Sequence, residues 1–410
     1  MPQTLSLSET TGLPFHRKPE ALLYLMAAAM PLSFAVWSAV IQNFVIEAAS
    51  FDGSDWGWMQ TVREIPGFLA VGVIAILWVM REQILAVVSL MMLGLGVALT
   101  AHFPTFGGLL LTTMISSIGF HYYETVNHSL QLQWLSKARA PIVLGRLVAV
   151  GSASSLVAYV ALVLTWKTFD LSYSFVMMLG GALTIAIAAY CYLAYPQFEA
   201  PNPQRKTFVL RRRYWLFYTL EFMSGARRQI FVVFAAFMMV ERFGFEVHQV
   251  TALFLINFVA NMAFAPLMGH FVARFGERMA LSIEYGGLVL VFLAYGGVYY
   301  FGWGVLVAAA LYVVDHLFFA LALALRTYFQ KIADPKDIAP TAAVSFTINH
   351  IAAVFLPAAL GYLWIVSPGA VFWLAAGLAG LSLGLALLIP RSPQPGRETI
   401  LARRVPLVAE

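Results

Sequence analysis

Residues 196–213 read PQFEAPNPQRKTFVLRRR, and this segment lies at the middle of the chain. It holds three prolines and a cluster of basic residues, whereas the sequence on either side of it is dominated by long apolar runs. Six such runs precede the segment and six follow it. Two halves of six apolar runs, joined by one polar connection, are typical of an internally duplicated membrane protein.

Each of the twelve apolar runs is long enough to cross a bilayer as a helix. A hydrocarbon core about 30 Å thick needs roughly 20 apolar residues in helical form. Only helices and closed barrels satisfy every backbone group in lipid, and runs without a two-residue alternation exclude a barrel. We therefore expect transmembrane helices at residues 21–48, 57–80, 83–102, 106–134, 141–166, 171–195, 214–241, 248–273, 277–301, 303–332, 338–366 and 368–389.

The composition agrees with a protein that lies mostly in lipid. Hydrophobic residues make up 61% of the chain and charged residues only 11%, against roughly 25% charged residues in soluble proteins. The single cysteine, Cys191, lies in an apolar run and excludes an internal disulfide. The first twenty residues lack the pattern of a cleavable signal, so the run from Ala21 is expected to be a retained helix.

The distribution of lysine and arginine predicts the orientation. Cytoplasmic loops carry an excess of these residues. The side that receives both tails and the alternate loops carries eighteen of them, and the other side carries Lys167 and Arg242. Both termini are therefore expected to be cytoplasmic, in a multi-pass protein of the inner (plasma) membrane. The eighteen are Arg17, Lys18, Arg81, Lys137, Arg139, Arg205, Lys206, Arg211, Arg212, Arg213, Arg274, Arg278, Lys331, Lys336, Arg391, Arg397, Arg403 and Arg404.

These patterns predict an all-α integral membrane protein. We expect a cytoplasmic N-terminal tail at 1–20, a six-helix bundle at 21–195, a basic cytoplasmic linker at 196–213, a second six-helix bundle at 214–389 and a cytoplasmic C-terminal tail at 390–410.

A short motif lies between the eighth and ninth runs, where residues 269–278 read GHFVARFGER. It resembles the loop signature of the major facilitator superfamily, which has a glycine, three residues, an acid, a base, any residue, a glycine and further bases. Ala273 takes the place of the acid and Glu277 that of one base. The residues that match the signature are Gly269, Arg274, Gly276 and Arg278.

The resemblance extends over residues 20–390, because the helix number and the central basic loop also agree with it. It implies two pseudo-symmetric six-helix bundles, secondary transport, and a role for the four matching residues in gating. In this fold the first, fourth, seventh and tenth helices line a central cavity, and the third, sixth, ninth and twelfth face lipid. The outer runs are accordingly almost free of charge, since only the ninth carries an acid, Glu284.

The seventh run places Arg227 and Arg228 near its midpoint. Successive residues on a helix point 100° apart, so the two side chains face different surroundings. Guanidinium binds carboxylate or phosphate in bidentate fashion, and one hypothesis is that an arginine contacts an anionic group of the substrate. The alternative is that both pair with structural acids such as Glu221 or Asp315. One face of this helix carries Tyr218, Glu221, Gly225 and Arg228.

The fourth run carries a polar stripe at helical spacing. His121, Glu124 and His128 share one face with Gln131. A carboxylate beside imidazoles in a membrane cavity fits a proton relay, with Glu124 as the first candidate for proton coupling. A divalent metal site and a purely structural polar seam are the alternatives, and we assign no metal. The stripe is flanked by Tyr123 and Asn127, which are candidate substrate contacts.

Other polar residues lie within the runs. The adjacent charges Arg63 and Glu64 are expected to point apart, so that Glu64 pairs with a distant arginine or carries a proton. Asp315 is expected to neutralise an arginine of the seventh run. Polar residues at such positions serve helix contacts or substrate binding, and both remain open. The further candidates are Trp37 for substrate binding, Asn349 and His350 near the middle of the eleventh run, and Arg146 in the fifth.

The sequence favours a secondary transporter without a cofactor. It contains no phosphate-binding loop of the Gly-x-x-x-x-Gly-Lys type, so the energy must come from an ion gradient or from the gradient of the substrate. The leading prediction is a monomeric, proton-linked carrier of a small organic anion or amphipathic metabolite, working by alternating access and not an enzyme. No nucleic acid partner is expected. The alternatives are a carrier that exports cationic or neutral drugs and a non-transporting membrane scaffold.

Overall fold

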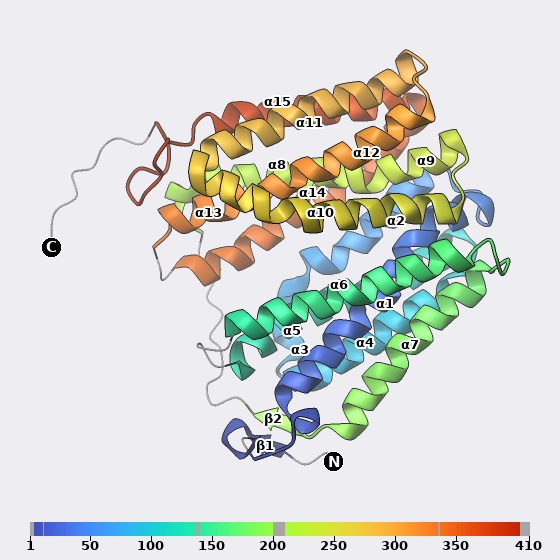
Figure 1. Ribbon diagram of the computed structural model, residues 1–410, viewed down its shortest axis with the longest axis vertical. Helices are drawn as coiled ribbons and strands as arrows, with labels where there is room; N and C mark the ends of the chain where they lie inside the picture. Colours follow the sequence, from blue (N-terminus) through green and yellow to red (C-terminus); the bar gives the residue numbers. More distant parts are fainter. Residues whose placement is uncertain (1–3, 11, 136–139, 200–209, 335–336, 402–410) are drawn as a thin grey trace. The chain divides into compact units, whose positions relative to one another are not determined.

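The computed structural model describes residues 4–10, 12–135, 140–199, 210–334 and 337–401 (Figure 1). Nearly all of these residues lie in helices. Most of the predicted linker, residues 200–209, lies outside the described residues. Seven of the lysines and arginines used to predict the orientation also lie outside the described residues. They are Lys137, Arg139, Arg205, Lys206, Lys336, Arg403 and Arg404.

The chain divides into two compact units. The first unit comprises residues 1–51, 62–205 and 246–252, and the second comprises 52–61, 206–245 and 253–410. The main division falls within the segment that the sequence analysis assigns to the linker. Each unit is described separately below.

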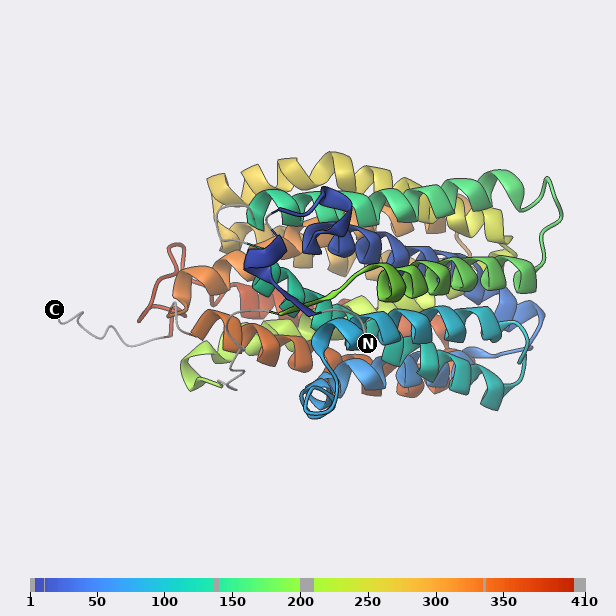
Figure 2. The ribbon, with the colours of Figure 1, turned by 90° about the horizontal axis from the view of Figure 1, so that it is seen from below.

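The first unit is a bundle of helices around a buried apolar core. Helix α1 packs against α6 and α7, and α4 packs between α5 and α7. Figure 2 shows α1 alongside α6 and α7 when the molecule is seen from below. The helices are α1 (Pro19–Glu47), the second part of α2 (Gly53–Phe68), α3 (Val73–Ile76), α4 (Glu82–Thr100), α5 (Phe106–Trp134), α6 (Ala140–Thr165) and α7 (Tyr173–Ala194), with short 3-10 helices η1 (Leu7–Thr10), η2 (Phe15–Arg17) and η3 (Ala70–Gly72).

The second expected run, 57–80, is not one continuous helix. Helix α2 contains Pro66 and ends at Phe68, and the 3-10 turn η3 and the short helix α3 follow it. Proline lacks the backbone N–H that would continue the helical ladder, and its ring crowds the preceding turn. The expectation of a single helix over this run was therefore wrong.

A small parallel sheet joins two segments that the sequence analysis assigns to a tail and a linker. Strand β1 (Thr4–Ser6) pairs with β2 (Gln197–Glu199). Gln83 at the start of α4 fixes the second strand, because its Nε2 donates to the carbonyl of Pro196 at 2.8 Å and its Oε1 accepts from the N–H of Phe198 at 2.9 Å. The N-terminal segment is thus tied to the end of the first bundle.

The second unit contains most of the remaining helices. Helix α11 packs along α15, α14 packs along α8, and α12 contacts α11. The helices are α8 (Trp215–Ile230), α9 (Ala236–Phe243), α10 (Val247–Phe275, of which residues 247–252 belong to the first unit), α11 (Glu277–Tyr300), α12 (Val305–Phe319), α13 (Leu323–Ile332), α14 (Ile338–Val366) and α15 (Pro368–Ala386), with the 3-10 turns η4 (Arg212–Tyr214) and η6 (Ala320–Ala322).

A π-helical turn, η5 (Phe231–Ala235), joins α8 to α9 and makes one helical stretch across the unit. A π-turn shifts the hydrogen-bond ladder by one residue. Here the carbonyl of Val233 accepts a hydrogen bond from Nε1 of Trp56, at 2.7 Å. Such turns occur frequently at functional sites, and this one begins three residues after Arg228.

Ten helical segments among the described residues are long and apolar enough to cross a membrane. Two of the twelve expected runs are not among these ten. One contains α2 and α3 and is interrupted by Pro66, and the other is α5, which carries the polar stripe. The prediction of an all-helical membrane protein is confirmed.

Candidate functional site

The two consecutive arginines of α8 lie in different surroundings within the second unit. Arg227 is completely buried, whereas Arg228 is half-buried. The guanidinium of Arg227 lies 3.8 Å from a carboxylate oxygen of Glu284 on α11 and 4.3 Å from the ring centroid of Tyr285. Arg228 instead faces α14, where its Nη2 donates to Oδ1 of Asn349 at 2.9 Å. The 100° step along the helix separates the two directions.

Arg227, Glu284 and Asp315 form what we call the buried charge cluster. Glu284 and Asp315 come from α11 and α12, and both are 0% exposed. Asp315 interacts electrostatically with both Arg227 and Glu284. The carboxylate oxygens of the two acids accept no hydrogen bond from the part of the chain that the structure describes. The cluster therefore places one guanidinium against two acids in a sealed, apolar environment.

Glu284 is the member of this cluster that the sequence analysis did not select as a site residue. It was assigned to an outer helix near its cytoplasmic end, but its side chain is buried and points toward α8. The available signal was an acid within an apolar run, because burial of a lone charge in a membrane is costly and marks a functional position.

Arg228 belongs to a second polar group, formed with Asn349 and Glu221. The Asn349 side chain donates from Nδ2 to the backbone carbonyl of Glu221 at 3.3 Å while its Oδ1 accepts from Arg228. Nε of Arg228 has no hydrogen-bond partner among the described residues. Asn349 thus fixes one side of the guanidinium, while the buried Nε is left without a partner among the described residues.

Gly225 allows this group to form. A Cβ at this position would lie 2.3 Å from the backbone oxygen of Asn349, so the backbones of α8 and α14 approach more closely than any larger residue permits.

Two other predicted site residues of α8 and α14 lie outside this polar group. Tyr218 is buried, and its hydroxyl accepts from the N–H of Arg211 at 3.3 Å. His350 is buried, with Nδ1 2.8 Å from the carbonyl of Phe346.

The polar stripe of α5 in the first unit runs from a buried to an exposed position. His121 is buried, whereas Glu124 and His128 are exposed. Of the flanking residues, Tyr123 is buried in the apolar core and Asn127 is half-buried. An exposed acid and an exposed imidazole one turn apart are groups that a proton relay would use.

Arg63 and Glu64 on α2 pair with each other. The distance between Nη2 and Oε1 is 2.7 Å, so the expectation that these neighbours point apart was wrong. The arginine side chain is long enough to turn back across the helix surface. Its guanidinium also lies 5.8 Å from the ring of Trp37, which is buried. Arg146 on α6 is exposed.

The motif loop joins α10 to α11 in the second unit. Gly276 has φ +81°, a conformation that only glycine adopts readily, and it separates the two helices. Arg274 is exposed and Arg278 half-buried, while a Cβ at Gly269 would meet nothing within 4 Å. Of the two motif glycines, only Gly276 is required by backbone conformation.

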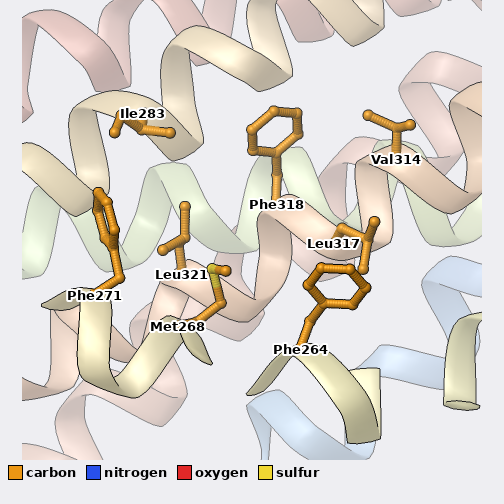
Figure 3. Close-up of a pocket in the computed structure, with 8 residues that line it drawn as sticks. All are labelled: Phe264, Met268, Phe271, Ile283, Val314, Leu317, Phe318 and Leu321. Carbon is orange, nitrogen blue, oxygen red and sulfur yellow. The ribbon is translucent and has the colours of Figure 1, made fainter. Parts of the chain in front are cut away.

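An apolar cavity of about 290 Å³ lies among α10, α11 and α12 (Figure 3). Its lining contains no charged side chain, so it does not suit a charged ligand, and none of the predicted site residues lines it. The eight lining residues are Phe264, Met268, Phe271, Ile283, Val314, Leu317, Phe318 and Leu321.

Comparison with known proteins identifies the family. A family model described as Major Facilitator Superfamily matches residues 22–357. The chain belongs to the major facilitator superfamily. Its resemblance to this superfamily and its fold class are thereby confirmed, and the chain is a multi-pass membrane protein and a secondary transporter of a small molecule rather than an enzyme.

Solved structures of other transporters have a similar fold. The nucleoside transporter NupG is 16% identical, with a TM-score of 0.73, over 90% of this chain and 99% of that chain. A bacterial homolog of the human lysosomal transporter Spinster is 13% identical, with a TM-score of 0.68, over 90% and 95%. The xylose transporter XylE from E. coli is 12% identical, with a TM-score of 0.63, over 89% and 96%. A search of curated proteins found no match.

Proposed function

We propose that this superfamily member is a proton-linked carrier of a small organic anion or an amphipathic metabolite with an anionic group, working by alternating access in the inner (plasma) membrane. The observation that carries the proposal is the half-buried guanidinium of Arg228, which Asn349 orients and whose Nε has no partner among the described residues. An arginine near the middle of a membrane helix needs an anionic or polar partner. A carboxylate of the substrate fits the remaining donors in bidentate fashion.

The charges around Arg228 leave room for an anion. Glu221 is the acid within electrostatic reach, and it interacts with Arg326 as well as with Arg228. One carboxylate thus faces two guanidinium groups, so this part of the second unit carries an excess positive charge. Such an excess favours an anionic ligand and disfavours the cationic one that a drug exporter would take.

The coupling proton is assigned in the first unit to Glu124, with His128 one turn away. Both side chains are exposed, which suits exchange of protons with water. The similar structures include transporters named for nucleosides and for xylose, so the shared fold does not choose a substrate. The choice of an anion rests on Arg228 and on the excess positive charge around Glu221.

The test is uptake into proteoliposomes of a panel of radiolabelled mono- and dicarboxylates, with and without a pH gradient. We expect at least one anion to accumulate when a proton gradient is imposed, and Arg228→Gln to abolish its uptake. Arg228→Lys should retain part of the uptake, because the charge remains and the bidentate geometry is lost. Arg17→Gln, which changes an exposed arginine at the end of the short 3-10 helix η2, is the matched control.

Two outcomes would overturn the proposal. Uptake of cations or neutral drugs, with no response to the anions, would support the exporter alternative. A protein that folds and reconstitutes but moves neither the carboxylates nor a panel of cationic and neutral drugs would support the scaffold alternative.

A further inference from the structure

The buried charge cluster of the second unit has an unbalanced charge. Arg227 contributes one positive charge, and Glu284 and Asp315 would contribute two negative charges if both were ionised. All three side chains are 0% exposed, so water cannot solvate the excess charge. An isolated buried charge costs far more than its neutralisation by a proton.

The other titratable groups around the cluster do not supply the missing positive charge. On α8, Glu221 interacts with Arg228 and with Arg326. Among the described residues, Arg227 is the only arginine that interacts with Glu284 and Asp315. On α13, Arg326 is exposed, and Lys331 is paired with Glu277 at 2.7 Å. Helix α15 carries no titratable residue. The remaining titratable residues of α8, α11, α12, α13 and α14 are Tyr218, Arg278, Tyr285, Tyr295, Tyr299, Tyr300, Tyr312, His316, Tyr328, His350 and Tyr362.

The geometry also differs from that of a purely structural ion pair. A buried pair offsets its desolvation only with close contacts and further hydrogen bonds. Here the shortest contact between Arg227 and Glu284 is 3.8 Å, and the two carboxylates accept no hydrogen bond from the described residues. The cluster is therefore loosely held, which leaves its protonation free to change.

We propose that Glu284 and Asp315 share one proton, and that this pair is the proton-binding site of the second unit. On binding, an O–H bond forms on one of the two carboxylates, and the cluster becomes neutral with one carboxylate balancing Arg227. On release, the proton passes to water on the other side of the membrane and the cluster carries one negative charge. This assignment of proton exchange rests on the proposed proton-linked function.

The position of the site explains how a proton would be coupled to an anion. Arg227 and Arg228 are consecutive residues of α8, so a shift of Arg227 toward an ionised acid also moves the guanidinium assigned to the substrate. The π-turn begins at Phe231, three residues after Arg228. Protonation of the pair and occupation of Arg228 are thus linked through one helix.

The charge balance is tested by infrared spectroscopy of the purified protein near neutral pH, reading the C=O stretch of protonated carboxylic acids. Glu284→Gln and Asp315→Asn are each expected to remove one protonated carboxyl from the wild-type spectrum, because the acid that remains is balanced by Arg227. Arg227→Gln is expected to add one, because both acids are then neutral. Glu199→Gln, at an exposed position in β2, is the control and should leave the band unchanged.

Unchanged bands in both acid variants, or no added band in Arg227→Gln, would overturn the shared-proton site. A variant is compared with wild type only if it elutes and unfolds as a single species. If one of the two acid variants does not fold, the other acid variant alone tests the shared proton. The measurement needs no substrate, so it fails or succeeds independently of anion transport. Proton movement is then measured in proteoliposomes with a pH-sensitive dye, where Glu284→Gln should lower the number of protons moved per anion, because Glu124 in the first unit still carries its own proton. A retained flux with wild-type stoichiometry would overturn the coupling role.

Discussion

The guanidinium of Arg227 lies 3.8 Å from the carboxylate of Glu284, and neither side chain reaches the surface. The two residues are on α8 and α11, whose sequences give no indication that they face each other. Because of this contact, the face of α11 that carries Glu284 packs toward Arg227, and each helix depends on the other for the stability of its buried charge.

Removal of the cation from this cluster should destabilise the protein. Arg227→Met leaves two acids without a positive partner, and breaking a buried pair in this way costs about 3–5 kcal/mol. The double variant Arg227→Met with Glu284→Gln should recover part of the loss, since it removes one of the two acids. Thermal unfolding in detergent measures both effects, and equal losses in the single and double variants would contradict the pairing.

A methyl group at Gly225 should separate α8 from α14. The Cβ of Gly225→Ala would lie 2.3 Å from the backbone oxygen of Asn349, so the helices must move apart at a cost of about 1–3 kcal/mol. The contact of Arg228 with Asn349 should weaken, and transport should fall with it. Gly286→Ala on α11 is the matched control, because its Cβ would meet nothing within 4 Å. Similar unfolding temperatures for the two variants would contradict the close approach.

The motif glycine Gly276 should tolerate no side chain without strain. Its φ of +81° with ψ of 165° is accessible almost only to glycine, and a non-glycine residue there costs about 1–3 kcal/mol. Gly276→Ala should therefore lower the unfolding temperature, whereas Gly269→Ala, with open space around its Cβ, should leave it nearly unchanged. If the loop gates transport, the first variant should also slow the transport rate. Equal effects of the two substitutions would show that the loop conformation is not the cause.

An ion pair before α14 should make stability depend on pH. Arg211 donates to both carboxylate oxygens of Asp337, at 2.7 and 2.9 Å, and these bonds hold the pKa of Asp337 below its ordinary value of 3.8. Because the folded pKa is lower than the unfolded one, the stabilisation is present above pH 3.8 and is lost as the pH falls through the folded pKa.

Asp337→Asn should therefore lower the unfolding temperature near neutral pH, and its difference from wild type should shrink as the pH falls below 3.8. Thermal unfolding across this range provides the measurement. Asp170→Asn is the control, because Asp170 is exposed and its φ of 48° is one that asparagine accepts. A difference that persists unchanged at low pH would rule out the ion pair as its origin.

The helices were predictable because lipid imposes a length and a composition on every span. The divergence of Arg227 and Arg228 also followed from the helical step alone. The inward direction of Glu284 did not, because it depends on the rotation of α11 against α8, which a largely apolar sequence leaves undetermined. The pairing of Arg63 with Glu64 depended on side-chain conformation rather than on backbone direction.

Contacts between distant segments were likewise not predictable from the sequence. Strand β1 pairs with β2 across nearly two hundred residues, and only three residues of each strand take part. So short a strand has no periodicity of its own to detect. The π-turn after α8 has no sequence signal either, because the run from Phe231 to Ala235 has the composition of an ordinary apolar helix.

The role of Arg228 is tested most directly by simultaneous measurement of anion uptake and internal pH in proteoliposomes. For the anion that wild-type protein accumulates, we expect uptake accompanied by proton movement, loss of both in Arg228→Gln, and partial retention in Arg228→Lys. Undiminished uptake and proton movement in Arg228→Gln would contradict this role.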